Sequence, residues 1–145
     1  MNIEKYFIDK FGDKEEVRKA IDFFKKINTD IPLESIKEIR KGILGTTVIT
    51  IEGEDKKEVI IEIRNDNEIS YTYEGLMGYI KNVENNKDLA RIATKLPFYK
   101  DEEELLKDLE DFKKNSKEGK YAVIINGSPI LYKIAELRGK NIIVH

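Results

Sequence analysis

The chain has 145 residues, of which 26 are Lys or Arg, 28 are Asp or Glu and none is Cys, and its formal net charge is −2. This length suits one domain with its own hydrophobic core, so we expect a single domain over residues 1–145. The lack of cysteine excludes disulfides, thiolate catalysis and cysteine-ligated zinc. The near-balance of charge gives no general attraction to nucleic acid or to anionic lipid.

No segment of the sequence suggests export or membrane insertion. The first residues carry no apolar run typical of a signal peptide, and no stretch approaches the roughly 20 apolar residues of a spanning helix. We therefore expect a cytoplasmic protein without a membrane partner. Charged residues make up 37%, with many Lys, Glu and Ile, which is typical of thermophile proteins. AT-rich coding gives the same bias, and the labile Asn126-Gly127 pair weakens the thermophile interpretation, which remains the preferred one.

The N-terminal part is predicted to be helical. Residues 2–11 form a short apolar pattern that ends at Gly12, and Asp13 with Glu16 has the spacing of a capping box. The helix that follows has an apolar face made by Val17, Ala20, Ile21, Phe24 and Ile27. A third helical pattern begins near Pro32 and ends at Gly42, with Leu33, Ile36 and Ile39 as its apolar residues.

Residues 46–74 change to a period of two, which is typical of strands with one buried face. The pattern predicts three strands joined by short turns at residues 53–56 and 65–67, hence an antiparallel meander. The residues expected to be buried are Ile49, Ile51, Val59, Ile61, Ile63, Ile69 and Tyr71, and those expected to be exposed are Glu58, Glu62 and Thr72. The outer face should be polar and acidic, interrupted by Val48 and Ile60.

From Gly75 the helical period returns, and we expect helical structure up to Pro97 with a break at Asn85-Asn86; the alternative is one kinked helix. Asp101 and Glu104 repeat the capping-box spacing and open a further helix that runs to about Asn115. Ser116–Lys120 is the expected linker to the C-terminal unit.

The C-terminal unit reads as strand, helix and strand over Tyr121–Asn126, Ser128–Arg138 and Asn141–Val144. Ser128 and Pro129 suit the start of this helix, and Gly139 suits its end. Two apolar strands joined by a helix imply parallel pairing in a right-handed β-α-β unit. Together with the meander, this predicts an α+β fold of about five strands in a mixed sheet, with helices covering mainly one face.

The candidate ligand site is the strand-to-helix loop Asn126-Gly127-Ser128. Backbone N–H groups at a helix N-terminus favour an anion, and ligands of open α/β sheets settle outside such strand ends. An anionic small molecule is therefore the ligand expected there. The alternative is structural, because Ser128 can act only as a cap and Gly127 only as a turn residue; the glycine spacing of a phosphate-binding loop is absent.

Other chemistry-bearing residues are better explained by structure. Glu102–Glu104 are acids of a first helical turn, Asn65–Glu68 reads as a hairpin turn rather than a calcium loop, and His145 is the terminal residue. Tyrosines on the meander invite base stacking, but Tyr71 and Tyr73 share the apolar face and the outer face is acidic, which disfavours nucleic acid. We therefore assign no catalytic residue, no metal site and no cofactor.

Two functions are compatible with this sequence. The first is a non-enzymatic binding or protein-interaction module, acting as a homo-oligomer or with a protein partner. Apolar residues at Val48, Ile60 and in residues 2–11 motivate self-association. The second is a small-molecule or phosphate-ligand-binding domain, an enzyme included, with its site at Asn126–Ser128. An interaction module requires an exposed apolar patch, whereas a ligand site requires a concave opening with convergent polar groups.

Overall fold

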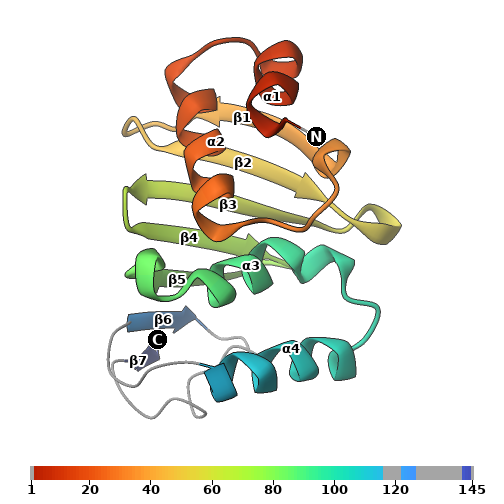
Figure 1. Ribbon diagram of the computed structural model, residues 1–145. Coiled ribbons are helices and arrows are strands. Elements are labelled where there is room, and N and C mark those ends of the chain that lie inside the picture. The colour runs from red at the N-terminus through yellow and green to blue at the C-terminus, as the bar shows by residue number, and fades with distance from the viewer. Residues whose placement is uncertain (1, 116–121, 127–141, 145) are drawn as a thin grey trace.

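The computed structural model describes residues 2–115, 122–126 and 142–144. A seven-stranded sheet carries four α-helices of this part of the chain on one face (Figure 1). The helices are α1 (Ile3–Phe11), α2 (Glu15–Ile27), α3 (Lys87–Lys95) and α4 (Glu102–Asn115). The strands are β1 (Ile36–Lys41), β2 (Thr47–Glu52), β3 (Glu58–Asn65), β4 (Glu68–Tyr73), β5 (Leu76–Lys81), β6 (Ala122–Asn126) and β7 (Ile142–Val144).

The strands lie in the sheet in the order of the sequence, from β1 to β7. All neighbours from β1 to β6 pair antiparallel, and β6 pairs with β7 parallel. The α+β class, the meander of residues 46–74 and the parallel C-terminal pair are thus confirmed. The helix predicted over Ser128–Arg138 and the linker Ser116–Lys120 lie outside the described residues.

Strand β1 replaces the helix predicted after Pro32, so that prediction was wrong. A short 3₁₀ turn, Leu33–Ser35, comes first, and the strand then pairs Ile36 with Ile51 and Ile39 with Ile49. The register shifts between Ile36 and Glu38, which marks a bulge. The extra residue brings two isoleucines three positions apart onto the same face, and this spacing imitates a helix.

Strand β5 likewise replaces a predicted helical segment. A spacing of four, as between Leu76 and Ile80, is compatible with one face of a strand as well as of a helix. Glu74 and Gly75 both have positive φ (51° and 78°) and form a two-residue hairpin loop, with Tyr73 paired to Leu76. Gly78 lies opposite Tyr71, and a Cβ there would lie 2.2 Å from the Tyr71 hydroxyl oxygen. Close packing on the Tyr71 ring therefore requires glycine at position 78.

The hydrophobic core lies between the sheet and the helices. Six of the seven residues predicted to be buried in the meander are buried, and Ile63 is partly buried. Of those predicted to be exposed, Glu58 is exposed, whereas Glu62 and Thr72 are half-buried. Glu62 is shielded because its carboxylate accepts hydrogen bonds from the hydroxyls of Thr46 (2.7 Å) and Ser70 (3.4 Å).

The apolar surfaces that motivated self-association are largely covered. Val48 is only 5% exposed on the outer face of the sheet. In α1, Phe7 is fully buried and makes edge contacts with the rings of Phe11 and Phe24, at centroid distances of 5.8 and 5.6 Å. Phe7 thus belongs to the core, and Val48 is covered on the opposite face of the sheet, although both were expected to leave apolar surface exposed.

The two predicted capping boxes differ in outcome. At α4, the Asp101 carboxylate accepts a hydrogen bond from the Glu104 N–H (3.0 Å), and the Glu104 carboxylate accepts one from the Lys100 N–H (2.9 Å). At α2 the box is not formed, because the N-cap residue is Lys14. The Asp13 carboxylate instead accepts two hydrogen bonds from the Arg18 guanidinium (2.7 and 3.0 Å), which lowers the pKa of Asp13.

Candidate functional site

Only one residue of the predicted anion loop is described. Asn126 is the last residue of β6, where its backbone pairs with Met77. Gly127 and Ser128 lie outside the described residues, as does His145. The anion site at Asn126–Ser128 therefore stays a prediction.

Two acidic segments that the sequence analysis explained by structure, Asn65–Glu68 and Glu102–Glu104, form a turn and the start of a helix. Asn65–Glu68 forms the β3–β4 turn, closed by a hydrogen bond of 2.9 Å from the Asn67 N–H to the Asn65 side-chain oxygen. Glu102–Glu104 begin α4. Within residues 2–115, 122–126 and 142–144, no group of three or more His, Asp or Glu is arranged to hold a metal ion. No helix in that part of the chain has the length and apolarity to span a bilayer.

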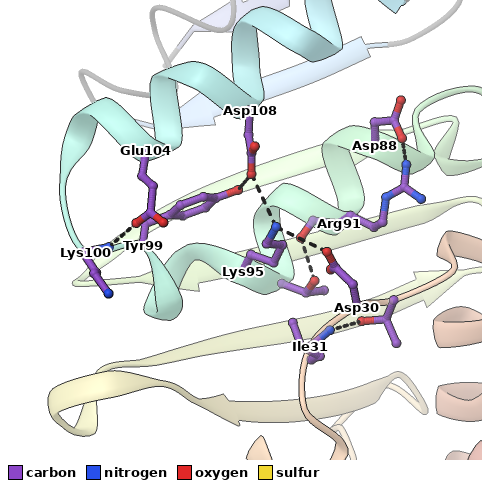
Figure 2. A network of polar contacts seen from close by, with 11 residues as sticks. Asp30, Ile31, Asp88, Arg91, Lys95, Tyr99, Lys100, Glu104 and Asp108 are labelled. Atoms are coloured by element: carbon purple, nitrogen blue, oxygen red, sulfur yellow. Dashed lines mark hydrogen bonds and ion pairs between the residues drawn. The ribbon is translucent and has the colours of Figure 1, made fainter.

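A polar cleft lies where α3, α4 and the segment after α2 meet (Figure 2). Its volume is about 230 Å³. The lining residues are Asp30, Asp88, Arg91, Ile92, Lys95, Asp108, Asp111 and Phe112. Four carboxylates and two cations thus surround an apolar floor, so the cleft is a concave site with convergent polar groups.

Lys95 is the centre of the contacts in this cleft. Its ammonium nitrogen lies 3.4 Å from a carboxylate oxygen of Asp30 and 3.4 Å from one of Asp108. The Tyr99 hydroxyl donates a hydrogen bond of 2.6 Å to the same Asp108 oxygen (Figure 2). The network therefore ties α4 to α3 and to the segment after α2, which is a structural role.

Tyr99 is held in its protonated form. Burial raises the pKa of the Tyr99 phenol far above its ordinary value, and the hydrogen bond to Asp108 and the charge of that carboxylate raise it further. The phenol is thus a permanent donor at neutral pH and no general base. Arg91 pairs with Asp88 at the other side of the cleft. The cations are engaged by carboxylates, so the cleft suits a cationic ligand better than an anionic one.

The second candidate site is the hairpin tip, which we define as residues 42–46 between β1 and β2. Ile43 is 100% exposed and Leu44 is 89% exposed. The turn itself is well formed, since the Gly45 N–H donates to the Gly42 carbonyl (3.1 Å) and the Gly42 N–H to the Thr46 carbonyl (2.7 Å). Gly45 has φ +78°, the glycine bulge that commonly closes a three-residue hairpin loop.

Turn chemistry does not explain the two aliphatic residues. The central positions of such turns favour Asn, Asp, Ser, Gly or Pro, which offer local hydrogen bonds or suitable dihedral angles. Ile43 buries no surface in this chain and Leu44 buries little, so they contribute almost nothing to the stability of the fold. Sequence reasoning missed this site. The available signal was Gly-Ile-Leu-Gly, a pair of aliphatic residues between glycines directly before an alternating strand.

A small groove lies beside the hairpin tip, between α2 and the β3–β4 turn. Gly45 lines this end groove, whose volume is about 90 Å³. Its apolar residues are Phe23, Ile63, Ile69 and Val83, and its charged residues are Lys19, Asp22, Lys26, Arg64, Asp66 and Glu68. The Lys26 ammonium donates a hydrogen bond of 2.5 Å to the Asp66 carbonyl across it. A convex apolar tip and a concave groove with an apolar floor and charged surroundings thus share the same end of the sheet.

Comparisons of this chain with protein-family models, with curated proteins and with solved structures find no match. Candidate functions therefore rest on the chemistry of the tip, the end groove and the cleft.

Proposed function

We propose that this protein is an interaction module that contacts a protein partner through the hairpin tip. The observation that carries this proposal is the exposure of Ile43 and Leu44 in a turn closed by its own backbone hydrogen bonds. A surface that places large aliphatic side chains in water lowers its free energy when a partner covers them. The tip is convex, so the partner surface that fits it is an apolar pocket.

Strand addition at the nearby sheet edge is a poorer route to a partner. Four of the six residues of β1 are charged, and the strand carries a bulge. The Lys10 ammonium also donates a hydrogen bond of 2.9 Å to the Ile36 carbonyl at this edge. Charges, bulges and covering groups are the features that keep edge strands from pairing with other chains. On the β1 side of the molecule, the hairpin tip is therefore better suited to contact a partner than the strand edge is.

A lipid surface fits the tip less well than a protein pocket. Stable membrane attachment usually takes a second signal besides a small apolar insertion, such as a polybasic patch. The charges beside the tip alternate in sign: Arg40 pairs with Glu38 at 3.2 Å, and Arg64 pairs with Glu62 at 3.5 Å. This surface provides no excess of cations for anionic headgroups.

Site-specific photocrosslinking tests the proposal. We expect p-benzoylphenylalanine at position 44 to crosslink a partner in extract of the source cells. The same probe at Glu54, in the hairpin at the other end of β2, should give no such adduct. Excess unmodified chain should compete the adduct away, while excess Ile43→Ser/Leu44→Ser chain should not. Equal adducts at both positions, or equal competition by both chains, would refute the proposal.

The alternative function, small-molecule binding, has the polar cleft as a specific observation in its favour. Its volume of about 230 Å³ is below the roughly 300–1,000 Å³ of common ligand sites, so it would accept only a small molecule. Its carboxylates around Ile92 and Phe112 suit a short alkylamine. Titration with putrescine should shift amides of residues 88–95 and 108–112 if this function holds, and phosphate serves as the control. Phosphate shifts near Asn126 would instead support the predicted anion loop.

A further inference from the structure

We propose that the partner is a second copy of this chain, related by a two-fold axis, with the hairpin tip of each copy in the end groove of the other. This inference rests on the proposed function and names its partner. Ile43 and Leu44 would be covered by Phe23, Ile63, Ile69 and Val83 of the facing copy.

The arrangement follows from the position of the two surfaces. Gly45 belongs to the tip and also lines the groove, so the two features are neighbours at one end of the sheet. When a tip and a groove lie side by side, one two-fold axis allows both copies to insert at once. A contact without that symmetry would leave one tip and one groove of the pair unfilled. These would bind further copies, so the assembly would grow into an open chain of molecules. The reciprocal dimer fills both and closes.

The size of the end groove favours a side chain as its occupant. About 90 Å³ is far below the roughly 300 Å³ at which small-molecule pockets begin. Phe23, Ile69 and Val83 at its floor are already only 1–6% exposed in the single chain and Ile63 is partly buried, so the contact would mainly remove the apolar surface of Ile43 and Leu44 from water.

The charges of the groove rim also suit a copy of the same surface. The rim holds three cations, Lys19, Lys26 and Arg64, and three carboxylates, Asp22, Asp66 and Glu68. A two-fold interface brings a surface against itself, so a rim of a single sign would repel its copy. A rim with both signs can place unlike charges opposite each other. The net charge of −2 on each chain adds little repulsion over longer distances.

The expected dimer is weak. Stable protein interfaces bury about 1,200–2,000 Å² in total, and two tips of two side chains supply only part of that area. We therefore expect a dissociation constant in the micromolar range, so the chain should be monomeric in dilute solution and dimeric when concentrated.

Sedimentation velocity on the purified chain, from low to several hundred micromolar, tests the dimer. Ile43→Ser/Leu44→Ser should raise the dissociation constant by about a hundredfold or more. Asp22→Arg places a long charged side chain at the mouth of the groove and should also weaken the dimer. Glu110→Arg, the same charge change at an exposed position of α4, should not. A mixture of the first two variants should form a heterodimer that is tighter than either variant alone, because one tip and one groove remain intact.

Spin labelling locates the interface. Because the chain contains no cysteine, Lys41→Cys accepts a nitroxide at a single position beside an intact tip. Mixed with ¹⁵N-labelled wild-type chain, the label should broaden amides of residues 19–26 and 64–68 in the other copy, together with those of the adjoining hairpin tip. Broadening elsewhere, or variants that leave the dimer unchanged, would overturn the reciprocal arrangement.

Failure of this inference and failure of the proposed function are distinguishable. A chain that stays monomeric at every concentration overturns the second copy as partner. The position-44 crosslink to a different protein would then still support the interaction function. Loss of both the dimer and the position-dependent crosslink would reject both proposals.

Discussion

Strand β2 begins at the hairpin tip of residues 42–46 and ends at a second hairpin, residues 53–57, and the two turns are unusual in different respects. The first places glycine where φ is positive but exposes two aliphatic side chains. The second exposes polar residues, but Asp55 (φ 56°) and Lys56 (φ 59°) are both left-handed without being glycine. The exposed apolar side chains of the first hairpin and the strained backbone of the second therefore need separate explanations.

The second hairpin is held by packing. Gly53 lies against the 3₁₀ turn Leu96–Phe98, and a Cβ at position 53 would lie 2.3 Å from the Pro97 carbonyl oxygen. The Lys57 N–H donates to the Glu54 carbonyl (3.1 Å) and closes the turn around the two left-handed residues. Such strain persists where the surroundings determine the backbone. Position 45 of the hairpin tip has no such neighbour, since a Cβ at Gly45 would meet nothing within 4 Å.

The comparison predicts its largest effect for Gly53→Ala. The atoms that the new methyl group meets belong to the backbone of Pro97, so no rotamer change can relieve the clash. We expect a loss of about 3 kcal/mol in the free energy of unfolding, measured by urea denaturation. A loss below about 1 kcal/mol would show that this hairpin can move away from Pro97, and the packing explanation would then be wrong.

Gly45→Ala should have a smaller effect with a different cause. The site has space, so only the left-handed backbone is unfavourable, and we expect a loss of about 1–2 kcal/mol. Gly45→Asn should lose less than Gly45→Ala because asparagine tolerates this conformation better. Equal losses for the two variants in the same denaturation experiment would argue against backbone conformation as the cause.

The contrast between the hairpins also shows what could be predicted from the sequence. Strands β2, β3 and β4 alternate along their length, and the one register shift between β3 and β4, at Ile63/Asn65, lies next to the turn, so their faces and their antiparallel pairing were predictable. A bulge in β1 and the glycine at position 78 in β5 hid the period of two, and both segments were predicted to be helical. The alternation is therefore informative only where no bulge or glycine interrupts the middle of a strand.

The candidate sites were less predictable for a related reason. Because the segment before Gly42 was expected to be a helix, Ile43 and Leu44 fell into a connection with no expected surface. The end groove combines residues of α2, β3, β4 and the segment after β5, which are far apart in the sequence. Only the fold brings them together. The predicted loop at Asn126–Ser128 depends on local sequence alone, and two of its three residues lie outside the described part of the chain.

Lys56→Gly should stabilise the protein. Glycine adopts positive φ without the steric conflict of a Cβ, and Lys56 is exposed, so little contact is lost. After the greater flexibility of glycine in the unfolded chain is included, we expect a gain of about 1 kcal/mol. Lys57→Gly is the matched control, because Lys57 has φ −70° and should lose stability when replaced. Thermal and urea unfolding of both variants would decide the sign.

The smallest effect on stability is predicted for Ile43→Ser/Leu44→Ser. Hydrophobic stabilisation is proportional to the apolar area that folding removes from water, and these two side chains are as exposed in the folded chain as in the unfolded one. The free energy of unfolding should therefore change by less than about 0.5 kcal/mol, while the variant no longer competes with the crosslink formed by the probe at position 44. Glu54→Ser, at the other end of β2, should change neither property.

Urea denaturation of the Ile43→Ser/Leu44→Ser variant, at a concentration that keeps the chain monomeric, measures the stability of the single chain alone. A loss above about 1 kcal/mol there would mean that the tip packs within its own chain, and its exposure could then no longer be taken as evidence of a partner.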